Sequence, residues 1–162
     1  MKAAVLVVCA LAIAAPAAAQ HDQHHRQLNE RGRQFMGFDQ EATVHHFSLA
    51  KDGGRIVVTA KDPNDAASIG RIRDHLAHIA GEFQKGNFDL PALVHDTRAV
   101  PGVEAMKKHA ASLTFAFEPI DRGAHVRITG GTAEAIAAVH EFLRFQIRDH
   151  KTGDPEIIKD ER

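Results

Sequence analysis

One pattern occurs twice in this 162-residue chain and restricts its fold more than any other feature. Two short segments of alternating apolar residues, joined by a glycine-containing turn, precede a long segment with apolar residues at helical spacing. A period of two indicates strands, and a period near 3.6 indicates a helix. Strand pairs are therefore expected at 44–60 and 113–129, and long helices at 65–84 and 132–150.

The two copies also match position by position. Residues 67 positions apart correspond in the two helices: Ile72 with Val139, Leu76 with Leu143, His75 with Phe142 and His78 with Phe145. Gly54 and Gly123 fall in equivalent turns. The pattern predicts an α+β fold, in which two ββα units form a four-stranded antiparallel sheet with two long helices on one face.

The chain divides into segments of different composition. We expect a signal peptide (1–19), a flexible His-rich leader (20–34), a single α+β domain (35–153, with an insert at 85–111) and a C-terminal tail (154–162). The first segment combines Lys2, an apolar run and a final Ala17-Ala18-Ala19, which is typical of a cleavable secretory signal. Its apolar run is too short for a membrane anchor. Periplasmic or secreted localisation is therefore expected.

Composition excludes several kinds of chemistry. The only cysteine, Cys9, is expected to leave with the signal peptide, which removes disulfides, thiolate metal sites and cysteine nucleophiles. The formal net charge is −1, so the chain lacks the excess of positive charge with which proteins bind nucleic acid or an anionic membrane surface. Histidine is the exception, because all twelve histidines follow the predicted cleavage site. They supply metal-ligand capacity at neutral pH.

The helix predicted at 65–84 carries the most specific candidate motif for metal binding. His75, His78 and Glu82 form one ridge beside its apolar stripe, within reach of a single borderline metal ion. A solvent-exposed flank with a His–Glu or Arg–Glu pair is the alternative. Strand parity places His45 toward the helices, where His75 could reach it, and His46 on the opposite face. Either His45 or His46 is expected to bind the metal together with His75, His78 and His95.

Other candidate ligands lie in the connection between the units and before the first strand pair. His95 is followed by Asp96, which could orient the imidazole ring. Met36 and Met106 could each supply a soft thioether to copper(I), or could simply fill the core. His150 is expected only at the end of the second helix.

These patterns favour an exported protein that binds copper or zinc through histidines, in a binding or chaperone role. No nucleophile or assembled acid–base pair indicates catalysis, although a small hydrolase or a haem binder could use the same histidines. The alternative is a metal-free interaction module or homodimer that uses the open sheet face. That face comprises His46, Arg55, Val57, Thr59, His125 and Arg127.

Four stretches resemble a group of small exported bacterial proteins that carry the label aspartate carbamoyltransferase. They are Met36–Phe38, His45–Phe47, Arg73–Ala80 and Glu141–Ile147. The resemblance implies an exported protein and spans most of the chain after residue 19. Because the Ser-Thr-Arg-Thr-Arg phosphate-binding motif of transcarbamoylases is absent from the sequence, no catalytic residue is assigned from it.

Overall fold

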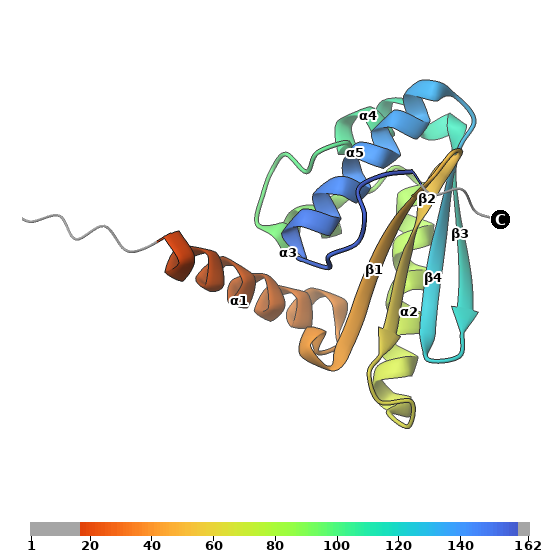
Figure 1. Cartoon of the computed structure of the whole chain (residues 1–162). Helices are drawn as coiled ribbons and strands as arrows, with labels where there is room; N and C mark the ends of the chain where they lie inside the picture. Colours follow the sequence, from red (N-terminus) through yellow and green to blue (C-terminus); the bar gives the residue numbers. More distant parts are fainter. Residues whose placement is uncertain (1–16, 159–162) are drawn as a thin grey trace, which may run out of the picture.

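The computed structural model describes residues 17–158, and its centre is a four-stranded antiparallel sheet with the order β1-β2-β4-β3 (Figure 1). The strands are β1 (Thr43–Ala50), β2 (Gly53–Ala60), β3 (Leu113–Ile120) and β4 (Gly123–Gly130). Both predicted strand pairs are confirmed. In the second hairpin the first strand continues through Pro119 and Ile120 up to the turn. Proline is tolerated there because β3 is an edge strand.

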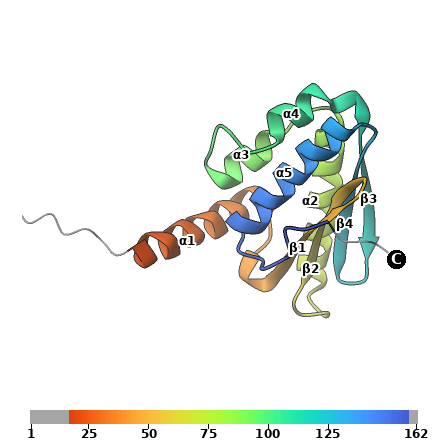
Figure 2. The ribbon, with the colours of Figure 1, turned by 45° about the horizontal axis from the view of Figure 1, so that its top comes forward.

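Two long helices, α2 (Ala66–Gln84) and α5 (Ala133–Asp149), follow the two hairpins (Figure 2). Asp65 and Thr132 cap their first turns, and each side chain accepts a hydrogen bond from the backbone N–H three residues later. Both helices pack against the same face of the sheet. The predicted α+β class and ββα layout are therefore confirmed.

The hydrophobic core lies between this sheet face and the two helices. Its members alternate along the strands and recur every third or fourth residue along the helices, as the two periods require. The main contributors are Phe47, Ile56, Val58, Val126 and Ile128 from the sheet, Ile72, Leu76, Ile79 and Phe83 from α2, and Val139, Phe142, Leu143 and Ile147 from α5.

The register of the central strands relates the two units to each other. Gly53 and Gly123 begin β2 and β4, 70 residues apart, so that Ile56 and Val126 are equivalent positions. These two residues are also direct partners in the antiparallel pairing of β2 with β4. The units are therefore related by an approximate twofold axis that passes between these two residues.

The segment before the sheet differs from the sequence prediction. Residues 20–34 were expected to be a mobile leader, whereas they belong to the helix α1 (Ala17–Met36). Leu28 is fully buried, and Arg31 donates from Nε to the carbonyl of Val94 at 2.9 Å. One buried leucine among polar residues gives too weak a period to predict a helix, but packing against another element stabilises it.

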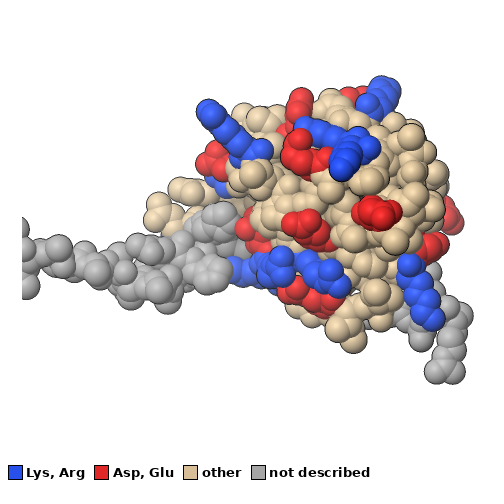
Figure 3. Space-filling model, turned by 90° about the horizontal axis from the view of Figure 1, so that it is seen from above, with Lys and Arg blue, Asp and Glu red and all other residues tan. Residues whose placement is uncertain are grey.

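The predicted signal peptide lies almost wholly outside the described residues, as does Cys9. Within residues 17–158, no helix has the length and apolar character needed to cross a membrane. On the face seen in Figure 3, acidic and basic side chains are interspersed rather than gathered into a patch of one sign.

The insert between the units contains two short helices, α3 (Asp89–His95) and α4 (Val103–Lys108). The sequence predicted an irregular connection where α3 forms, because seven residues are too few to show a period. Gly102 lets α4 approach α5 closely. Its φ is +81°, and a Cβ at this position would lie 2.4 Å from the carbonyl oxygen of Ala138.

Candidate functional site: a pocket with imidazole walls

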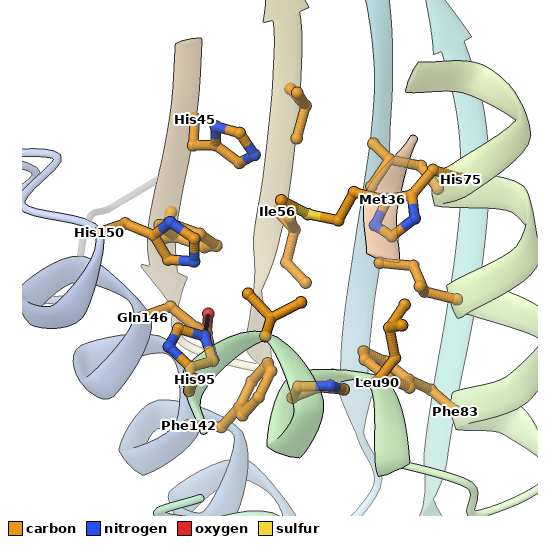
Figure 4. A pocket seen from close by; sticks show the side chains of 16 residues that line it. Met36, His45, Ile56, His75, Phe83, Leu90, His95, Phe142, Gln146 and His150 are labelled. Atoms are coloured by element: carbon orange, nitrogen blue, oxygen red, sulfur yellow. Dashed lines mark hydrogen bonds between the residues drawn. The ribbon is translucent and has the colours of Figure 1, made fainter. Parts of the chain in front are cut away.

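A pocket opens at the point where β1, α2, α3 and the C-terminal end of α5 converge (Figure 4). The space between its walls and at its mouth, which is open to solvent, amounts to about 490 Å³. Most of the lining is apolar, but each surrounding element contributes one histidine. These are His45 from β1, His75 from α2, His95 from α3 and His150 from the end of α5. Met36, the last residue of α1, extends into the same space (Figure 4).

His45 and His75 are neutral imidazoles at pH 7. Burial, with smaller contributions from the neighbouring His75 and His46, lowers the pKa of His45 to about 4. Burial also lowers the pKa of His75 to about 4, with a smaller contribution from His78. Phe38 contacts both rings, with centroids 6.0 Å from His45 and 5.5 Å from His75. His45 and His75 both line the pocket on the helix-covered face, His45 from the side of β1 and His75 from the side of α2 (Figure 4).

Two nitrogen atoms of this pocket are buried without a hydrogen-bond partner among the described residues, Nε2 of Gln146 and Nε2 of His45. Of the two, the imidazole nitrogen of His45 has the lone pair that a metal ion needs. An unsatisfied buried polar group costs about 1–3 kcal/mol. A bound ion or polar ligand would recover that energy.

His95 is held on both of its ring nitrogens. Nδ1 lies 2.5 Å from Asp149 Oδ2, and Nε2 lies 2.9 Å from Gln146 Oε1. The sequence suggested Asp96 as the orienting carboxylate, which is wrong. The carboxylate of Asp96 is 80% exposed and lies 3.9 Å from Arg31. His95 therefore fixes α3 to α5 and can become a metal ligand only by giving up one of these bonds.

His150 belongs to the pocket although the sequence assigned it only to the end of a helix. Its ring stacks on His45, with centroids 5.3 Å apart and planes 12° apart, and stands nearly perpendicular to His95 at 5.0 Å. Phe142, Gln146 and His150 are spaced four residues apart and form one ridge of α5. From the sequence, this four-residue spacing could have indicated that His150 lies on the same side of the helix as the core residue Phe142.

Four predicted ligands lie outside this pocket: His46, His78, Glu82 and Met106. His78 and Glu82 line a separate depression, where Glu82 accepts hydrogen bonds from Lys85 and Asn87. Of the predicted ridge on α2, only His75 borders the apolar stripe closely enough to enter the pocket. Met106 is fully buried in the hydrophobic core on α4, and so serves as core filler.

His46 lies on the opposite face of β1, as its parity predicted. Its Nδ1 is 2.9 Å from Asp154 Oδ1, and the other carboxylate oxygen accepts from the backbone N–H of Phe47. The chain beyond α5 thus returns to the sheet, where Ile158 forms a parallel bridge with Leu49. His46 holds this returning segment.

Replacing Asp154 by alanine is expected to release residues 152–158 from β1 and to lower the free energy of unfolding by about 1.5–3 kcal/mol, because two hydrogen bonds to a charged group are lost. Limited trypsinolysis at Lys151 and denaturant unfolding measure the two effects. Glu156→Ala is the matched control, since it removes only a half-exposed pair with Arg148. Equal behaviour of the two variants would contradict the role given to Asp154.

The open sheet face is tied together by its own contacts. Arg127 donates to the carbonyl of Gly54 at 2.9 Å and pairs with Asp52. His125 lies 3.3 Å from Glu118.

No preformed centre for a metal ion with three or more His, Cys, Asp or Glu ligands exists among the described residues. The chain matches no protein-family model, no curated protein and no solved structure.

Proposed function

We propose that this chain is an exported protein that binds a transition-metal ion, copper or zinc, through imidazole nitrogens in the pocket, and that its role is binding or delivery rather than catalysis. The supporting observation is the convergence of His45 and His75 from different elements on one pocket, with Met36 and His150 beside them.

The protonation state of these rings suits a ligand. Metals bind imidazole only in its neutral form, and protons compete for the same nitrogen. Because burial lowers the pKa of His45 and of His75 to about 4, both rings stay available well below neutral pH. The unpartnered Nε2 of His45 would gain its missing interaction. Rotation of the His45 and His75 side chains would bring their nitrogens together around one ion in the pocket.

The double variant His45→Ala/His75→Ala is expected to lose metal binding. The affinity should fall by more than the roughly 100-fold loss that changes around a metal ligand typically cause. The measurement is titration of untagged protein with zinc, copper(II) and copper(I), together with elemental analysis after purification.

The control is His78→Ala, which removes an exposed imidazole from the same helix outside the pocket. It should bind like the unmodified protein. Equal affinity in the double variant would contradict the pocket as the site. If the protein bound no metal and formed a dimer in light-scattering measurements, the function would move to the open sheet face.

A further inference from the structure

We infer that the ion is copper(I), held by the thioether of Met36 together with the imidazoles of His45 and His75. This inference rests on the proposed function and adds the identity of the ion and its sulfur ligand. Three observations support it: the chemistry of the donors, their number and the charge of the pocket.

The donor set contains sulfur. Met36 ends α1 and is half-buried, and Figure 4 shows its thioether extending into the pocket on the side of His75. A thioether is a soft ligand, which selects copper(I) over harder divalent ions. Zinc is bound by cysteine, histidine, aspartate and glutamate, so Met36 would contribute nothing to a zinc site.

The number of nitrogen donors also disfavours zinc. A structural zinc site takes four ligands in a tetrahedron. In the pocket, both nitrogens of His95 are already hydrogen-bonded. At most three imidazoles are left, one fewer than a zinc site with four protein ligands requires. Two imidazoles and one thioether satisfy copper(I), which accepts low coordination numbers.

The charge of the pocket favours a monovalent ion. Of the described residues that line it, none is acidic. The free energy needed to transfer an ion from water to an apolar environment grows with the square of its charge. In a pocket without a carboxylate, this desolvation free energy is therefore much larger for a divalent ion than for a monovalent one. The pocket walls, which include Phe47, Leu76 and Phe83, therefore suit copper(I) better than copper(II) or zinc.

The test is an anaerobic titration with copper(I) against a chromophoric cuprous chelator, with a parallel zinc titration. One equivalent of copper(I) is expected to bind, and Met36→Leu should weaken this binding about tenfold or more. Met106→Leu is the matched control, because it removes a buried methionine outside the pocket. X-ray absorption of the copper-loaded protein should show a sulfur neighbour that Met36→Leu lacks.

The outcomes separate this inference from the proposed function. Binding of zinc or copper(II) at the pocket without tight copper(I) binding, or a copper(I) site without a sulfur neighbour, would overturn the inference and leave the proposed function standing. A folded protein that binds none of the three ions would overturn both. Circular dichroism of Met36→Leu checks that the variant is folded, and the absorption spectrum of the unmodified protein tests the sulfur ligand independently.

Discussion

Replacement of His95 by alanine is expected to lower the free energy of unfolding by about 2–4 kcal/mol, because a buried ring that makes two hydrogen bonds is lost and a cavity is left behind. The imidazole is 2% exposed, and it bridges Asp149 and Gln146 on α5. Its ring also packs edge-on against Phe145. Alanine would remove these contacts, together with the one to His150, and leave a cavity between α3 and α5.

Denaturant unfolding followed by circular dichroism measures this loss, since the chain has neither tryptophan nor tyrosine for fluorescence. His78→Ala is the control for loss of a histidine and should change stability by no more than about 0.5 kcal/mol. The cycle of His95→Ala with Asp149→Ala should be strongly non-additive, because the two side chains act as one unit. A loss below about 1 kcal/mol in His95→Ala would show that the bridge does not anchor α3.

Local pattern was sufficient to predict the framework of this fold. Strands and long helices follow from two periods that a single segment of sequence already contains. Strand parity is equally local, and it placed His45 on the covered face and His46 on the other face correctly. The caps Asp65 and Thr132 are residue types that favour helix starts wherever they occur.

The site could be predicted only in part, because its members meet through tertiary packing. His95 is held by Asp149, 54 residues away, and not by the adjacent Asp96. His150 enters the pocket because the end of α5 reaches β1, and no local period encodes that meeting. Met36 reaches the pocket from α1, a helix whose polar sequence gave no sign of docking.

Acidification of the metal-free protein is expected to reduce its stability in the range where histidine titrates. The pKa values of His45 and His75 are about 4 in the folded chain, against an ordinary value of 6.5. Between these values the unfolded chain binds more protons than the folded chain, so the free energy of unfolding falls as the pH falls. The stability is fully present above pH 6.5. Between pH 7 and pH 5 each ring should contribute a loss of about 2 kcal/mol.

His75→Phe is the variant that isolates this effect. Phe142 occupies the equivalent position of the second unit and lines the same pocket, so a phenyl ring at position 75 has a precedent in the fold. The substitution removes one titrating ring and also one neighbour that lowers the pKa of His45, so the loss of stability between pH 7 and pH 5 should fall by about half or more. Unfolding curves at both pH values measure the difference, and His78→Ala should keep the pH dependence of the unmodified protein. If His75→Phe lost as much stability as the unmodified protein, His75 would have to be solvated in the folded chain, and its nitrogen would face the same proton competition as any surface histidine.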